Sequence, residues 1–181
     1  MVAQGSGNWI VSVLLIAGLA PGLPLRAETV YESVQDFVGR AFGEAPPGPA
    51  VVWLSGVRKV AIRELLGHDY PALRVRYWCR APRSAWVLDE IGKDLPITVG
   101  VIVEGRKIQS VKVMIYRENR GDEVVAPAFV DQFAGLRSGQ HQGLSDPIDG
   151  ISGATLSVRA LTRLAVMAVY LHVDTGCDDE P

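Results

Sequence analysis

The sequence predicts an α+β fold: an antiparallel sheet of four to five strands, helices packed on one face, and a long carboxy-terminal helix. Two patterns support this. Residues 73–118 alternate apolar and polar side chains with a period of two, which is typical of half-buried strands in a meander. Residues 154–172 instead repeat apolar side chains every three to four positions, which is typical of a packed helix.

Within the meander, the apolar stretches predict strands over 73–79, 85–92, 94–105 and 107–118, with Gly105 at the last turn. A segment of 45 residues precedes it. There the spacing predicts helices over 28–42 and 57–66 around a short strand at 50–54, so we interpret 28–72 as an amino-terminal helical segment. Residues 73–173 then form the main domain. One or two helical turns are expected at 129–136, a loop at 136–150, and a frayed acidic tail at 174–181.

Composition is that of one globular domain with or without an appendage. The chain has 181 residues, 48% of them hydrophobic, with 18 basic and 20 acidic side chains and a net charge of −2. These values exclude a disordered chain, a collagen-like fibre and a disulfide-dense mini-protein. The basic residues are dispersed, so we expect no nucleic-acid partner.

The first 27 residues differ from the rest. Residues 1–25 carry no charge, and an apolar run of 12 residues at 9–20 is interrupted by Pro21 and Gly22. A membrane-spanning helix needs about 20 apolar residues, whereas a signal peptide needs fewer. We therefore expect a signal peptide over 1–27 and a periplasmic or otherwise extracytoplasmic protein. An uncleaved membrane anchor is the alternative.

The two cysteines, Cys79 and Cys177, are 98 positions apart, and the sequence leaves their pairing open. Paired Cys/His spacings are missing from the sequence, so the common iron–sulfur, haem and zinc sites are not expected. Paired carboxylates and a Ser/His/Asp order with interpretable spacing are also missing. We therefore expect no catalytic residues and no metal site.

The most informative stretch is IDGISGATLS, residues 148–157, at the start of the last predicted helix. Asp149 or Ser152 is expected to cap that helix, while Gly150 and Gly153 allow positive φ or a close approach to a ligand. Thr155 then lies in the first turn, where free N–H groups and the helix dipole favour a phosphate. This predicts a phosphoester site on Thr155. From the residues alone, a noncovalent anion site and a purely structural helix cap stay open.

Three elements resemble the FMN-binding domain family, in that family's order between about residues 95 and 165. DGISGAT followed by Ser157 resembles its flavinylation motif, and FVDQFAG at 129–135 resembles its Phe-x-x-Gln-Phe-x-Gly segment. YRENRGDEV at 116–124 resembles its Glu-Thr-Pro-Gly element, with Glu118 and Gly121 in place but Asn119 and Arg120 at the Thr and Pro positions. The family includes the periplasmic C subunit of sodium-pumping NADH:quinone reductase and the G subunit of the Rnf complex. This chain is more similar to stand-alone exported members.

The resemblance implies a cofactor and partners. In this family a separate flavin transferase, using FAD and a magnesium ion, attaches FMN to the motif Thr through a phosphoester. That implies covalent FMN on Thr155 and an electron-transfer flavoprotein that is not itself an enzyme, with membrane-associated redox partner proteins. The other cofactor-binding residues that it implies are Asp149, Gly150, Ser152, Gly153, Ala154, Ser157, Glu118 and Gly121.

Three aromatic residues of the meander, Trp78, Trp86 and Tyr116, are candidates for contact with the flavin ring, with core packing as the alternative. Two other functions are weighed against the covalent carrier. One is a noncovalent phosphate-ligand or cofactor-binding module without a redox role. The other is a secreted structural domain in which SGAT only caps a helix.

Overall fold

The computed structural model describes residues 28–139 and 143–178, and the predicted signal peptide lies outside them. All strands in this part of the chain belong to one antiparallel sheet, with the order β1-β6-β5-β4-β3-β2. The elements, in chain order, are β1 Thr29–Val30, α1 Val34–Phe42, β2 Ala50–Trp53, α2 Gly56–Leu66, β3 Arg74–Arg80, β4 Arg83–Ile91, β5 Pro96–Glu104, β6 Lys107–Tyr116, η1 Asp122–Val125, α3 Pro127–Val130, η2 Asp131–Phe133 and α4 Thr155–Asp174.

The α+β class, the four strands of the meander and the long last helix are confirmed. Gly105 and Arg106 have φ values of 55° and 64°, so the last hairpin turns through two left-handed residues. The strand count of four to five is low, because the segment 28–72 contributes two more strands. One of these, β1, pairs with β6, and the other, β2, pairs with β3. The amino-terminal segment therefore forms both edges of the sheet.

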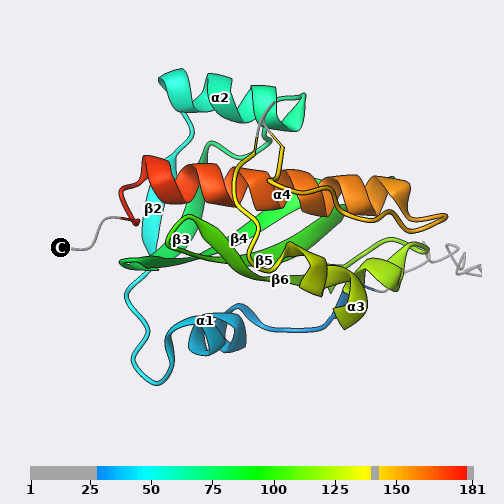
Figure 1. Ribbon diagram of the computed structural model, residues 1–181, viewed down its shortest axis with the longest axis horizontal. Helices are drawn as coiled ribbons and strands as arrows, with labels where there is room; N and C mark the ends of the chain where they lie inside the picture. Colours follow the sequence, from blue (N-terminus) through cyan, green and yellow to red (C-terminus); the bar gives the residue numbers. More distant parts are fainter. Residues whose placement is uncertain (1–27, 140–142, 179–181) are drawn as a thin grey trace, which may run out of the picture.

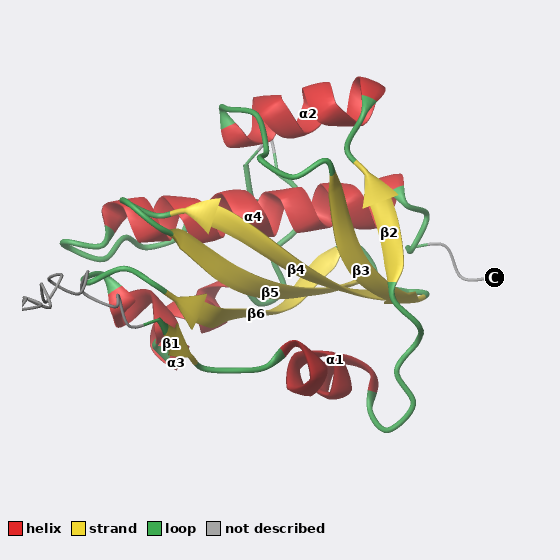
Figure 2. Ribbon diagram, turned by 180° about the vertical axis from the view of Figure 1, so that it is seen from behind, coloured by secondary structure: helices red, strands yellow, loops and turns green. Residues whose placement is uncertain are grey.

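Helices cover both faces of the sheet, so the expectation of helices on one face is wrong. Helices α2 and α4 lie on one side, and α1 lies on the other (Figures 1 and 2). Helix α1 packs closely because β5 has no side chain at Gly100, where an ideal Cβ would lie 2.5 Å from the Phe37 ring. Phe37 heads a second apolar cluster with Trp78, Ile102 and Met114. Strand β5 is consequently buried on both faces, which its continuous apolar sequence reflects.

Helix α4 is the main core helix. Its buried residues include Leu161, Leu164, Ala165 and Leu171, which pack in one cluster with β4, β5 and β6. By length and composition it is the one helix of the described residues that could cross a membrane, but most of it is buried inside the protein. Its apolar composition is accounted for by this packing against the sheet.

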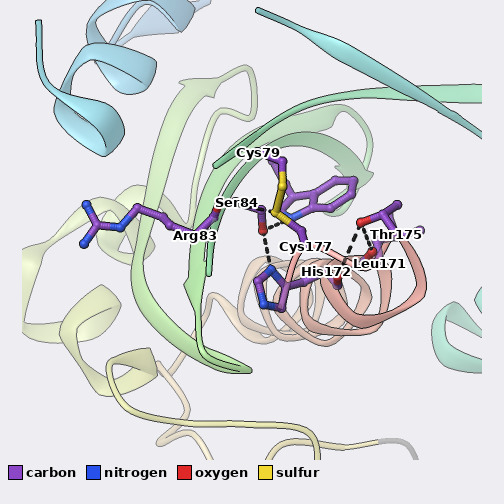
Figure 3. The surroundings of a disulfide bond; sticks show 8 residues. Cys79, Arg83, Ser84, Leu171, His172, Thr175 and Cys177 are labelled. Atoms are coloured by element: carbon purple, nitrogen blue, oxygen red, sulfur yellow. Dashed lines mark hydrogen bonds between the residues drawn. A yellow bond between two sulfur atoms is a disulfide. The ribbon is translucent and has the colours of Figure 1, made fainter. Parts of the chain in front are cut away.

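The carboxy-terminal residues after α4 are fixed to the sheet, which corrects the expectation of a frayed tail as far as Asp178. Cys177 is 1% exposed and forms a disulfide with Cys79 of β3, with their Cα atoms 6.1 Å apart (Figure 3). Asp178 pairs with Arg106 at the β5–β6 turn. The cross-link therefore joins the end of the chain to the side of the sheet that β2 borders.

A buried polar group lies beside this disulfide (Figure 3). The Nε1–H of Trp86 donates to Ser84 Oγ at 2.7 Å, and Ser84 Oγ lies 2.7 Å from Nδ1 of His172. Ser84 Oγ can accept from Trp86 and either donate to Nδ1 or accept from it, according to the tautomer of His172. Nε2 is buried, with no hydrogen-bond partner among the described residues. Burial lowers the pKa of His172.

Candidate functional site

Thr155 is the first residue of α4, as expected, and it is exposed. The residue before it, Ala154, is the N-cap and cannot cap the helix with its side chain. The first helical hydrogen bond runs from the Val158 N–H to the Ala154 carbonyl at 2.9 Å. The N–H groups of residues 155–157 therefore have no partner within the helix. Together with the helix dipole, they favour an anion beside the Thr155 hydroxyl.

The expectation that Asp149 or Ser152 caps this helix is wrong. Both are exposed on the preceding loop, and the Asp149 N–H donates to Gln132 Oε1 at 2.8 Å, which fixes the loop to η2. Of the two glycines, only Gly153 has a positive φ, at 87°, and it turns the chain into α4. The helix start is thus left open rather than closed by a side chain.

A cavity of about 390 Å³ opens at this helix start. Three segments line it: the β4–β5 turn, the loop after β6, and the first turn of α4. The lining residues are Lys93, Asp94, Glu118, Asn119, Arg120, Gly153, Ala154, Thr155, Leu156 and Ser157. Two of them, Lys93 and Arg120, are cations and can pair with an anionic group beside the helix start.

Glu118 organises one wall of this cavity. Its Oε1 accepts hydrogen bonds from the backbone N–H groups of three consecutive residues, Lys93, Asp94 and Leu95, at 2.7, 2.6 and 2.8 Å. The carboxylate therefore holds the β4–β5 turn, including Lys93 and Asp94, against the loop after β6.

Gly121, Tyr116 and Ser157 join that loop to α4. Tyr116 donates its hydroxyl hydrogen to the Arg120 carbonyl at 2.6 Å, so Ser157, 3.1 Å away, donates to the Tyr116 oxygen. Burial raises the pKa of Tyr116 above its ordinary value, which keeps the phenol protonated as this donor. Gly121 has φ 85°, and an ideal Cβ there would lie 2.9 Å from the Tyr116 oxygen and 3.0 Å from Ser157 Oγ.

The aromatic candidates do not gather at the cavity. Trp86 is fully buried and stacks on Tyr77 with ring centroids 4.5 Å apart. Through Ser84 it is joined to His172, which lies about 25 Å along α4 from Thr155. Trp78 is buried on the other face of the sheet, under α1. Of the two tryptophans, which the sequence predicts to face the last helix, Trp86 packs in the α4 cluster and Trp78 does not, and neither lines the cavity. Tyr116 alone approaches it, through Ser157.

Five cavity residues were not singled out from the sequence as site residues: Lys93, Asp94, Asn119, Arg120 and Leu156. Asn119 and Arg120 lie between Glu118 and Gly121, so the segment 116–124 that resembles the family's Glu-Thr-Pro-Gly element includes them. Leu156 directly follows Thr155. Lys93 and Asp94 lie 25 and 24 residues before Glu118. No local pattern in the sequence predicts the hydrogen bonds from their backbone N–H groups to the Glu118 carboxylate.

Comparison with known proteins is consistent with this geometry. The fold is similar to that of the crystal structure of NqrC from Shewanella oneidensis, with a TM-score of 0.54 at 15% identity over 76% of this chain and 91% of that chain. No curated protein sequence matches this chain. Residues 92–169, which include every residue of the cavity, match the model of the FMN-binding domain. This segment of the chain is therefore an FMN-binding domain.

Proposed function

We propose that this protein is an exported flavoprotein that carries FMN covalently on Thr155 and transfers electrons between redox partner proteins. One observation carries the proposal. Within the segment that matches the FMN-binding domain, Thr155 presents an exposed hydroxyl at an uncapped helix start, inside a cavity that also has two cations.

The residues of the cavity fit the phosphate of FMN. The N–H groups at the start of α4 would donate hydrogen bonds to the phosphate oxygens, and Lys93 and Arg120 would offset the phosphate charge. The flavin ring supplies the redox chemistry when it is bound, while the chain holds and orients it. An ester to Thr155 Oγ1 would keep the phosphate beside groups that also favour a free phosphate.

In residues 28–139 and 143–178, no histidine lies at the cavity beside Thr155. A Thr hydroxyl is a weak nucleophile without a base. Among the described residues His68 contacts Glu90 and His172 contacts Ser84, so neither lies at the cavity. We therefore infer that a flavin transferase supplies the base and uses FAD with a magnesium ion. The Thr155 oxygen bonds to the phosphorus of the FMN half, AMP leaves, and the Thr155 proton passes to the transferase.

A covalent link suits a protein outside the cytoplasm. Dissociated FMN would be lost by dilution there, whereas attachment makes binding intramolecular at high effective concentration. The apolar run at 9–20 supports export, either through a cleaved signal peptide or with the segment kept as a membrane anchor. The redox partners are then proteins at or near a membrane.

The decisive experiment measures the intact mass of the full chain after co-expression with a flavin transferase and export to the periplasm. We expect an added mass of FMN less one water, located on Thr155 when the peptide 149–159 is fragmented. Thr155→Ala should lose the adduct, while Thr155→Ser should keep part of it because the hydroxyl remains. Thr162→Ala, on the same helix but beyond the cavity, is the matched control and should be labelled fully.

Two results would contradict the proposal. The first is an unmodified wild-type peptide from cells whose transferase labels a control protein. The second is a flavin that stays with denatured Thr155→Ala protein, which would place the linkage elsewhere. An unmodified chain that binds FMN reversibly would favour the noncovalent cofactor-binding module.

A further inference from the structure

The β4–β5 turn has an unusual internal anion. Three successive backbone N–H groups, at residues 93–95, converge on one oxygen of Glu118. Such concave arrangements of successive N–H groups bind anions. Here the anion is the carboxylate of Glu118, which follows the end of β6 and itself lines the cavity.

Close packing fixes the turn against this carboxylate. At Gly92 an ideal Cβ would lie 2.9 Å from Ile97 Cδ1 and 3.1 Å from Glu118 Oε1. The Gly92 N–H also donates to the Leu95 carbonyl at 3.0 Å, which closes the turn around the three bonded residues. A side chain at residue 92 would displace Ile97 or the Glu118 carboxylate, so the small residue there suits the position of the turn.

The turn matters to the cavity because it carries Lys93. Lys93 and Arg120 are the two cations that line the cavity, and Arg120 lies on the same loop as Glu118. Without an acceptor at residue 118, the three N–H groups would have to turn toward water, and Lys93 would move with them.

We propose that Glu118 is a positioning residue of the flavin site. It acts through the β4–β5 turn, by placing Lys93 where its ammonium group pairs with the phosphate of FMN. Glu118 thus contributes to flavin binding through the turn rather than by contact with the flavin ring. The role of Lys93 rests on the proposed function, whereas the hold of Glu118 on the turn does not.

Hydrogen exchange tests the hold on the turn without any flavin. In full-length Thr155→Ala protein, the amides of residues 93–95 should be protected. Adding Glu118→Ala should speed their exchange by about tenfold, with a smaller increase for Glu118→Gln, which keeps a neutral acceptor oxygen. Glu123→Gln also removes one carboxylate nearby, from an exposed residue of η1, and should leave these amides unchanged.

Reversible FMN binding to the same Thr155→Ala background tests the role of Lys93. We expect Lys93→Ala to raise the Kd of FMN by about tenfold, and Glu118→Ala to raise it by a similar factor. Combined with Lys93→Ala, Glu118→Ala should add little further, because it acts through Lys93.

Unchanged exchange at residues 93–95 in Glu118→Ala would overturn the proposal. So would a full additional loss of affinity from Glu118→Ala in the Lys93→Ala background, since Glu118 would then act independently of Lys93. If the Thr155→Ala protein with no other change binds no FMN and the wild type is not flavinylated, the proposed function fails and the role of Lys93 with it. The exchange result still decides the hold of Glu118 on the turn.

Discussion

The two ends of α4 are built in opposite ways. At its start, Ala154 provides no side-chain cap, Thr155 is exposed, and a cavity opens beside the free N–H groups. At its end, His172 is fully buried and hydrogen-bonded to Ser84, and Cys177 is tied to the sheet. An uncapped helix start costs stability, and at α4 an anionic ligand can satisfy the same N–H groups.

The contrast separates a binding end from a stabilising end of one helix. Changes at the end of α4 should therefore alter the free energy of unfolding without removing the flavin site. Changes at its start should remove the flavin site and leave the free energy of unfolding nearly unchanged.

The largest expected effect on stability comes from the disulfide. Replacing both cysteines, in Cys79→Ser/Cys177→Ser, frees a loop of 98 residues and should lower the free energy of unfolding by about 4 kcal/mol. Urea unfolding of this variant and of the wild type measures the loss. Reduction of the wild-type protein is the control and should give a similar value. A loss below about 1 kcal/mol would show that the cross-link does not stabilise this end.

The next effect comes from Ser84→Ala. The change leaves the Trp86 N–H and His172 Nδ1 without their shared partner in a buried environment, so we expect a loss of about 2 to 3 kcal/mol. Thermal unfolding with Ser152→Ala, an exposed serine, as the control measures it. Equal stability of the two variants would mean that this buried hydroxyl contributes nothing.

A smaller effect follows from the pH dependence of His172. Burial lowers its pKa, so the unfolded chain binds this proton more readily than the folded protein does. Stability should therefore fall as pH drops below about 6.5, by at most about 1.4 kcal/mol per pH unit, until the lowered pKa is reached. His172→Gln should show a flatter curve between pH 7 and 5, and an equally steep curve would contradict the assignment.

The contribution of His68 to stability depends on pH in the opposite direction. Hydrogen bonds to the Asp69 carbonyl and to Glu90 raise its pKa, so its contribution is present below its ordinary pKa and is lost as pH rises through the raised value. His68 is unchanged in the His172→Gln variant, and so is the Arg106–Asp178 ion pair near His172. The difference between wild type and His172→Gln therefore isolates His172.

The smallest effect on stability is expected at the other end of the helix. Thr155→Ala changes an exposed side chain with no capping role, so the free energy of unfolding of the unmodified protein should change by no more than about 0.5 kcal/mol. The same change should abolish the flavin adduct. A large loss of stability from Thr155→Ala would blur the contrast between the two ends, and urea unfolding decides it.

Local patterns were enough to predict the meander and α4. Period-two alternation marks β3, a continuous apolar run marks β5, and Gly105 marks the turn between β5 and β6, because a two-residue hairpin turn needs left-handed residues there. The motif around Thr155 also placed it correctly at a helix start. Each of these features depends on residues that are close together in the sequence.

The errors concern contacts between distant segments. Trp78 suggested a ring contact because its strand neighbours are arginines, yet α1 covers it from more than 30 residues away. The choice between Asp149 and Ser152 as caps overlooked that Gly153 turns the chain after both of them. The link from Glu118 to the β4–β5 turn has no local pattern.

Both edges of the sheet come from the beginning of the chain, which bears on where the protein can be cut. A fragment restricted to residues 92–169 would lack β1, β2, β3 and β4, together with α1, whose Phe37 packs in one cluster with Ile102 and Met114. Such a fragment would expose two unpaired strand edges, which invite aggregation. A fusion or shortened version that keeps the fold must start no later than residue 28 and run through Cys177.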